Sequence, residues 1–406
     1  MNTSQDGILL SFQPIQGMRD ASPLELRLKN EVIDSVSKLL AENGFEMADY
    51  PIVEPTELFV KKSGGDIGGR LYSFVDPGGN RVSLRPEFTS SVIRSFLLEG
   101  SSNAGMRRQY AGPVFRYSDG KYTNELKQFT QIGCELIGSD SLQSDVQILK
   151  LALQAVSHTD TPSVTVRIGN IGLIRSLLTG QGLNETICFF VLSNLATLRA
   201  GAMSSRELVQ RATDLGLVSD LQGQKDQGQQ LLDKEYIQSH PPENLSGNTG
   251  RRSRSDIINR LVAKENTKVD AKSLSKAIDQ LTLFLKIVEG EVGHGQLLDI
   301  RNECGEEVQE KINELISIIE GVEDFESLGV RYILDFSTNR GLTYYSGLIF
   351  DISLDVPGDT VVGGGGRYDG LVRMLGGSED VPAVGFAINV DSLLSSDTQS
   401  RSTEKK

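Results

Sequence analysis

The stretch Lys127-Gln-Phe-Thr-Gln-Ile-Gly-Cys-Glu-Leu-Ile137 decides the fold, because it has the alternation of a β-strand. Successive side chains of a strand point to opposite faces, so one face carries Phe129, Gln131, Gly133 and Glu135. The other face, from Thr130 to Leu136, is mostly apolar and predicts a surface that helices cover. A carboxamide and a carboxylate on either side of a glycine indicate a ligand-binding surface. A solvent-exposed sheet face would show the same alternation, so that alternative stays open at this point.

Two further segments favour a ligand. In Leu84-Arg-Pro-Glu-Phe-Thr89, an extended run would place Arg85, Glu87 and Thr89 on one side, and Gly112-Pro-Val-Phe-Arg-Tyr117 directs Arg116 out of an apolar strand. A guanidinium suits a ligand carboxylate, and a carboxylate suits an ammonium or an imidazole N–H. Arg116 alone is more typical of a structural ion pair, but the three segments together predict a site for a zwitterionic amino acid with a polar side chain.

The surrounding pattern predicts an α+β fold, with an antiparallel sheet flanked by helices. Ser22-Pro-Leu-Glu25 is a capping box with proline at the first helical position, and it predicts a helix over residues 23–43. Strand patterns and two helices follow, without the regular alternation of βαβ units. The strands are expected at 71–75, 82–84, 113–117, 129–137, 164–168, 331–336 and 348–352, and the helices at 90–99 and 140–157.

Apolar spacing changes from strand-like to helical in the middle of the chain and then returns. We therefore expect a core in two parts, residues 1–172 and 326–394, separated by a helical insertion at 173–325. The polar stretch near 222–254 predicts a mobile linker, and residues 395–406 predict a disordered tail.

Composition excludes several classes of function. The 406 residues carry a net charge of −13, which disfavours tRNA, because backbone binding needs a basic face. No apolar run approaches the length of a membrane span, and the N-terminus lacks the pattern of a secretion signal, so we expect a cytoplasmic protein. The cysteines and histidines are too scattered for a disulfide frame or a metal site, and no cofactor is expected: these are Cys134, Cys188, Cys304, His158, His240 and His294.

Four strings occur in the order seen in histidyl-tRNA synthetases, which the chain resembles over roughly residues 12–170 and 328–394. They are Leu-Arg-Pro-Glu-x-Thr, Gly-Pro-Val-Phe-Arg-Tyr with Gln-Phe-x-Gln-x-Gly-x-Glu, Arg-Gly-Leu-x-Tyr-Tyr, and Gly-Gly-Arg-Tyr-Asp-Gly-Leu. The resemblance implies a class II aminoacyl-tRNA synthetase-like sheet and a dimer interface formed by the first helix and strand. It also implies that histidine is contacted by Glu87, Thr89, Arg116, Gln131, Glu135, Arg340, Tyr344 and Tyr345, with Tyr368 closing the pocket.

The chain departs from that family where ATP would bind. Ser118 stands in place of a glutamate and Ser392 in place of an arginine, while Thr343 replaces an aspartate and Phe88 a glycine. Polyphosphate needs cationic clamps, so we expect no adenylation. The glycine run at 363–366 lacks the spacing of a phosphate loop and indicates a sheet position approached closely by a ligand or helix. With 12 residues after Leu394 (406 − 394), no anticodon-binding domain is expected.

A synthetase-like core with these replacements resembles the regulatory subunit of ATP phosphoribosyltransferase. That resemblance implies a non-catalytic partner of a short catalytic subunit in the first step of L-histidine biosynthesis. It implies a homodimer within a hetero-oligomer, and feedback by L-histidine. Two alternatives remain: a divergent histidyl-tRNA synthetase-like enzyme that adenylates an amino acid, and a structural dimer that has lost the pocket.

Overall fold

The computed structural model describes residues 13–61, 67–100, 105–118, 126–157, 163–219, 269–288, 290–291, 294–336, 344–355 and 360–395. Within these ranges, no helix has both the length and the apolar character needed to cross a lipid bilayer. The chain forms two compact units, residues 1–172 with 289–406 and residues 173–288.

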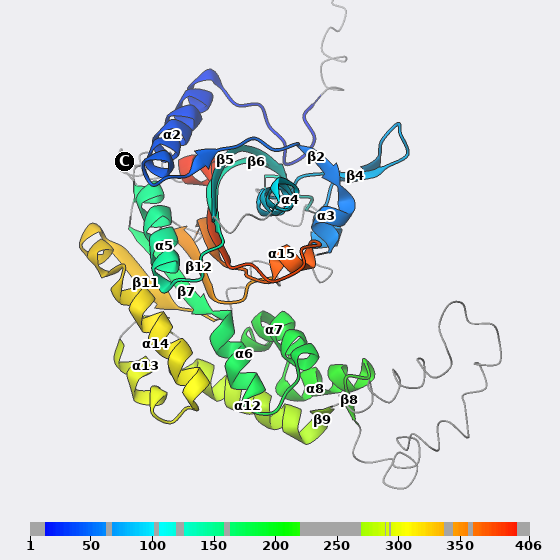
Figure 1. Ribbon diagram of the computed structural model, residues 1–406, viewed down its shortest axis with the longest axis vertical. Coiled ribbons are helices and arrows are strands. Elements are labelled where there is room, and N and C mark those ends of the chain that lie inside the picture. Colours follow the sequence, from blue (N-terminus) through cyan, green and yellow to red (C-terminus); the bar gives the residue numbers. More distant parts are fainter. Residues whose placement is uncertain are drawn as a thin grey trace, which may run out of the picture. The chain divides into compact units, whose positions relative to one another are not determined.

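The first unit is built on a nine-stranded sheet of order β1-β5-β6-β14-β13-β12-β7-β11-β10 (Figure 1). Its strands are β1 (Glu46–Met47), β5 (Met106–Phe115), β6 (Gln128–Ile137), β7 (Val164–Asn170), β10 (Gly290–Glu291), β11 (Val330–Leu334), β12 (Leu348–Leu354), β13 (Thr360–Arg367) and β14 (Ala383–Asn389). The contiguous pairs from β5 to β7 are antiparallel, and only β1 with β5 and β11 with β7 are parallel. The predicted α+β class and the antiparallel sheet are therefore confirmed.

Several helices pack on the mostly apolar face of this sheet, as its sequence pattern predicted. Helix α5 contacts β13 and β14, α2 contacts β6, and α14 contacts β7. The helices of this unit are α2 (Pro23–Glu42), α3 (Thr56–Val60), α4 (Thr89–Glu99), α5 (Leu142–Ser157), α13 (His294–Arg301), α14 (Glu306–Glu320) and α15 (Leu371–Met374), with 3₁₀ turns η1 (Ile67–Arg70) and η3 (Glu323–Leu328).

The opposite face curves around α4 (Figure 1). Val92, Ile93 and Phe96 of α4 join a buried cluster with Tyr110 of β5 and Phe129 of β6. Burying these large side chains is the main source of stability available to this side of the sheet. The surface predicted to hold a ligand therefore lies under a helix and is not an open sheet face.

The N-terminal elements form as their sequence predicts. The capping box is complete, since Ser22 Oγ accepts from the Glu25 N–H at 3.2 Å and Glu25 accepts from the Ser22 N–H at 2.7 Å. Residues 53–84 form a smaller sheet of order β2-β4-β3, which comprises β2 (Val53–Pro55), β3 (Ser73–Val75) and β4 (Arg81–Leu84). Pro55 lies on an edge strand of this sheet, which is where a residue without an N–H is tolerated.

The second unit is mostly helical. It contains α6 (Ile171–Thr179), whose first two residues belong to the first unit, and also α7 (Glu185–Arg199), α8 (Ser205–Asp214), α12 (Ala271–Val288) and a two-stranded sheet of β8 (Val218–Ser219) and β9 (Val269–Asp270). It ends at Val288, whereas the sequence placed its boundary at 325. Residues 289–325 group with the first unit because β10 pairs with β11 and α14 packs on α5 and β7. The linker near 222–254 and the tail from residue 396 lie outside the described residues.

Candidate functional site

The carboxylate of Glu135 is the centre of a hydrogen-bonded cluster on the concave face of the sheet. The Thr89 hydroxyl donates to Oε1 at 2.7 Å and the Tyr110 hydroxyl donates to the same oxygen at 3.1 Å. The Tyr368 hydroxyl donates a short hydrogen bond to Oε2. Three donors thus converge on the Glu135 carboxylate of β6: Thr89 is the first residue of α4, Tyr110 lies in β5, and Tyr368 follows β13.

Burial gives this carboxylate unusual acid–base behaviour. Glu135 is 1% exposed, and loss of solvation raises the pKa of its carboxyl group from 4.5 to about 7. The hydrogen bonds from Tyr368, Thr89 and Tyr110 lower that pKa, while the negative charge of Glu87 raises it further. Burial also raises the pKa of the Tyr110 and Tyr368 hydroxyls well above 10.0, so both are hydrogen-bond donors at neutral pH.

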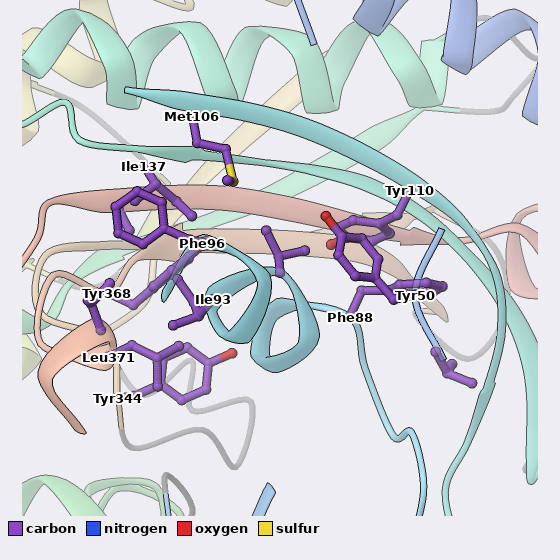
Figure 2. Close-up of a cluster of buried hydrophobic side chains, with 14 of the residues drawn as sticks. Tyr50, Phe88, Ile93, Phe96, Met106, Tyr110, Ile137, Tyr344, Tyr368 and Leu371 are labelled. Carbon is purple, nitrogen blue, oxygen red and sulfur yellow. The ribbon is translucent and has the colours of Figure 1, made fainter. Parts of the chain in front are cut away.

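Aromatic rings enclose the cluster. The ring of Tyr344 lies edge-on to that of Tyr368 with centroids 5.7 Å apart, and Tyr345 lies 4.9 Å from Tyr344. Figure 2 shows Tyr344 and Tyr368 near Leu371 on one side of α4, and Phe88, Tyr110 and Tyr50 on the other. An apolar wall around a few directed polar groups is the usual composition of a small-molecule site.

Glu87 is the second buried carboxylate of the site. It is 6% exposed and accepts hydrogen bonds from the Ser90 N–H at 3.3 and 3.2 Å, so it caps the N-terminus of α4. The positive end of a helix dipole stabilises a negative charge at such a position. Glu87 and Thr89 therefore reach the site from the start of a helix, and the run from Arg85 to Thr89 is not the extended segment that we expected.

Gln131 reaches the same face two residues before Gly133. Its side chain is 7% exposed, and its Oε1 has no hydrogen-bond partner among the residues that the structure describes. A buried carbonyl oxygen without a donor is uncommon and costs free energy. This oxygen is consequently an available acceptor for a ligand N–H.

Arg116 follows the last residue of β5 and is partly buried. Its Nε donates to the Pro86 carbonyl at 3.0 Å, and its guanidinium lies 5.1 Å from the centroid of the Phe129 ring. A contact between Arg116 and a bound ligand stays a prediction. Arg340, the remaining predicted arginine, lies outside the described residues.

Arg85 has a structural role instead of a ligand-facing one. Its guanidinium donates to the carbonyls of Pro113 at 2.9 Å and Tyr50 at 2.5 Å, and it lies 4.0 Å from the centroid of the Phe88 ring. The other side of the Phe88 ring stacks on Tyr110 at 4.3 Å. Phe88 thus fills space that a glycine would leave open.

The glycine-rich strand β13 packs tightly within the sheet. A side chain at Gly365 would overlap the Gly385 carbonyl of β14, and one at Gly385 would overlap Oε2 of Glu135. The close approach predicted for these glycines is made by the neighbouring strand and by the ring of Tyr345, which would lie 3.0 Å from a Cβ at Gly366. Neither a helix nor a phosphate is needed to explain the glycine run.

The residues after the glycine run divide between structure and site. Arg367 forms a buried ion pair with Asp145 of α5, with Nε 2.9 Å from Oδ1. Asp369 accepts from Arg367 at 3.2 Å and from the Ala383 N–H at 3.0 Å. These bonds fix the segment so that Tyr368, between them, points at Glu135.

Sequence reasoning missed Tyr110. The strand pattern was recognised only from Pro113 onward, although the strand begins at Met106. The signal available was the alternation along β5, since Tyr110 shares a face with Gly112 and Val114. Its register partner is Gly133, whose lack of a side chain leaves room for the tyrosine ring.

Comparison with known proteins establishes the family. A family model described as histidyl-tRNA synthetase matches residues 17–237 and 247–393. The chain therefore belongs to the histidyl-tRNA synthetase family. It is 29% identical over 94% of its length to a histidine–tRNA ligase of Sulfolobus acidocaldarius, of which it covers 73%. It is 27% identical, also over 94% of its length, to a histidine–tRNA ligase of Sulfurisphaera tokodaii, of which it covers 74%.

Solved structures agree on the fold. A protein from Bacillus halodurans C described as an ATP phosphoribosyltransferase regulatory subunit/histidyl-tRNA synthetase superposes with a TM-score of 0.62 at 21% identity, covering 95% of this chain and 83% of that one. Histidyl-tRNA synthetase from Nostoc sp. PCC 7120 superposes with a TM-score of 0.60 at 19% identity, covering 96% and 75%. The predicted class II aminoacyl-tRNA synthetase-like fold is confirmed.

Proposed function

We propose that this protein binds L-histidine on the concave face of the sheet and acts as a non-catalytic regulatory subunit of ATP phosphoribosyltransferase. The observation that carries the ligand assignment is the pairing of two buried carboxylates with an unpartnered carboxamide oxygen, in Glu87, Glu135 and Gln131. The two carboxylates, when ionised, and the carboxamide oxygen all accept hydrogen bonds, which matches a ligand rich in N–H donors.

Each part of histidine has a suitable partner in this proposal. The imidazole N–H donates to Glu135, in place of one of the hydroxyls that now fill its lone pairs. The ammonium group lies between Glu87 and Gln131, and the carboxylate lies toward Arg116. Tyr344, Tyr345 and Tyr368 provide the walls, while Thr89 keeps Glu135 in position.

The regulatory role is supported by the two serines, Ser118 and Ser392, that stand where synthetases of this family carry ATP-binding residues. Ser118 and Ser392 cannot neutralise a triphosphate, because hydroxyl groups carry no positive charge. A zwitterion can bind beside such groups much more readily than ATP can.

The partners follow from the same proposal. The phosphoribosyl transfer would belong to a short-form catalytic subunit, and this chain would supply histidine-dependent control. Self-association is supported by two leucines one turn apart on α2 that are 59% and 41% exposed, namely Leu24 and Leu28. Leucines exposed close together on one helix are typical of a surface that another subunit covers.

The test is a titration of the purified protein with L-histidine, followed by an assay with a short-form catalytic subunit. Calorimetry should show binding that Gln131→Leu weakens, and addition of this protein should stimulate the catalytic subunit. D-Histidine and L-lysine serve as matched controls, because they differ from the ligand in handedness or in the imidazole. Absence of heat with millimolar L-histidine would refute the ligand assignment.

The second candidate is a histidine–tRNA ligase, and a specific observation favours it. Both curated relatives described above are histidine–tRNA ligases, aligned over 94% of this chain. A ligase would catalyse histidine-dependent exchange between ATP and pyrophosphate. Exchange that depends on L-histidine and disappears in Glu135→Gln would establish the enzyme and overturn the regulatory role, even though histidine binding would stand.

A further inference from the structure

Strand β6 loses its neighbour at the point where it enters the site. The last paired position between β14 and β6 is Asn389 with Gln131, and the chain turns into a helix at Val390. Thr130 is the next residue of β6 on that side. Without a strand beside it, its N–H would be an unpaired donor next to the ligand-facing residues.

Asp391 occupies the vacated place in the hydrogen-bond ladder. Its Oδ2 accepts from the Thr130 N–H at 2.7 Å, so a side chain continues the pairing that the backbone of β14 has left. The helical turn holding Asp391 is itself fixed, because the Asn389 side chain accepts from the Ser392 N–H at 3.1 Å. Asp391 is 6% exposed, which makes this bond costly to replace with water.

The other oxygen of Asp391 is held by helix α2. Lys29 Nζ lies 2.8 Å from Oδ1 and also donates to the Thr130 hydroxyl at 3.2 Å. Arg19 Nη2 lies 3.9 Å from the same oxygen. Thr130 is thus bound through both its backbone and its side chain, once directly by Asp391 and once by the lysine that neutralises Asp391.

Thr130 lies between two residues of the candidate site. Phe129, on one side, supports the guanidinium of Arg116, and Gln131, on the other, presents the unpartnered Oε1. Since adjacent strand residues point to opposite faces, fixing Thr130 from the helix-covered face sets the height and direction of Phe129 and Gln131 on the ligand face.

We propose that Asp391, with Lys29, is a positioning residue that ties helix α2 to the ligand-facing part of β6, so that histidine affinity depends on this contact. Asp391 itself does not touch the ligand. This inference rests on the proposed histidine binding and extends it, because it makes the conformation of α2 part of the binding site.

The experiment compares two variants that each remove the acid of a buried ion pair. Asp391→Ala removes the ion pair with Lys29. The two charged atoms of this pair are 2.8 Å apart, and the side chains of Lys29 and Asp391 are 17% and 7% exposed. The control, Glu54→Ala, removes the ion pair between Arg94 and Glu54. Its charged atoms are also 2.8 Å apart, and the side chains of Arg94 and Glu54 are 29% and 5% exposed. Glu54 makes no contact with β6 among the bonds described for it, because its partner Arg94 lies in α4, so its loss should reduce stability without releasing strand β6.

Two measurements on the full chain are needed: the dissociation constant for L-histidine and hydrogen exchange of the amides of β6. Asp391→Ala should weaken histidine binding by about 10-fold or more, as removal of orienting partners does in metal sites. It should also speed exchange across residues 128–133. Glu54→Ala should leave both close to the wild-type values, and Asp391→Glu should recover part of the affinity if it restores the bond to Thr130.

Unchanged affinity in Asp391→Ala, when the wild type binds histidine, would overturn the positioning role. Equal losses in both variants would also overturn it, because they would reflect general destabilisation. If the wild type binds no histidine, the proposed function fails, while the exchange rates of β6 still decide whether Asp391 positions the strand.

Discussion

Replacing Glu135 by glutamine should remove a pH dependence from the stability of this protein. Burial raises the pKa of Glu135 from 4.5 to about 7, so the folded state prefers the protonated carboxyl group. The stabilisation from this proton is complete below pH 4.5 and is lost as the pH rises to about 7. At about 1.4 kcal/mol for each pKa unit, ionisation costs the folded state about 3 kcal/mol in total.

Glutamine imitates the protonated form in shape and hydrogen bonding, but it does not titrate. Relative to Glu135→Gln, the wild type should therefore lose about 2 kcal/mol of unfolding free energy between about pH 5.5 and pH 8.5. This window also avoids the isoelectric region near pH 4.9, where the net charge vanishes. The assay is urea denaturation of both proteins at four pH values across the window, with equal slopes against urea as the check on two-state unfolding. Parallel stability curves would refute the inference that Glu135 is a desolvated, titrating carboxyl group.

Three other substitutions test separate parts of the structure. Gln131→Met should weaken histidine binding while changing the unfolding free energy by less than about 1 kcal/mol, because the lost Oε1 has no partner; calorimetry and urea denaturation measure the two, and a large loss of stability would mean that the carboxamide is structural. Phe88→Gly should destabilise the protein by about 3–5 kcal/mol through loss of a buried ring stacked between Arg85 and Tyr110, and a thermal melt unchanged from the wild type would contradict that packing. Arg367→Met should cost about 3–5 kcal/mol by leaving the Asp145 carboxylate buried without its partner, and adding Asp145→Leu should restore part of this loss; a double variant no more stable than Arg367→Met would show that the ion pair is not the cause.

Local patterns were sufficient to predict several of the elements around the site. The capping box at Ser22 and Glu25 predicted the start of α2, because both of its hydrogen bonds are made within one turn. The two faces of β6 were predicted from alternation alone, and α2 does pack on the mostly apolar one, where Lys29 reaches Thr130, while α4 packs on the other. The same alternation placed Glu135 on the face opposite the apolar one, with Gln131 and Gly133.

Long-range pairing could not be predicted in the same way. The Tyr110 hydroxyl reaches Glu135 only because Tyr110 pairs with Gly133, a register that no local pattern contains. Arg85 looked like a ligand contact, but the carbonyls of Tyr50 and Pro113 take its guanidinium. Truncation of Glu135 to alanine would leave three buried hydroxyl donors unpaired, a cost that follows from these long-range contacts.

The tyrosines around Glu135 allow ligand binding to be followed by intrinsic tyrosine fluorescence. The chain has 10 tyrosines and no tryptophan, so its ultraviolet emission comes from tyrosine alone. A phenol hydrogen-bonded to a carboxylate emits weakly, and both Tyr110 and Tyr368 are in this state. A molecule that takes either bond should brighten that emission, which allows occupancy to be followed in a cuvette without a label.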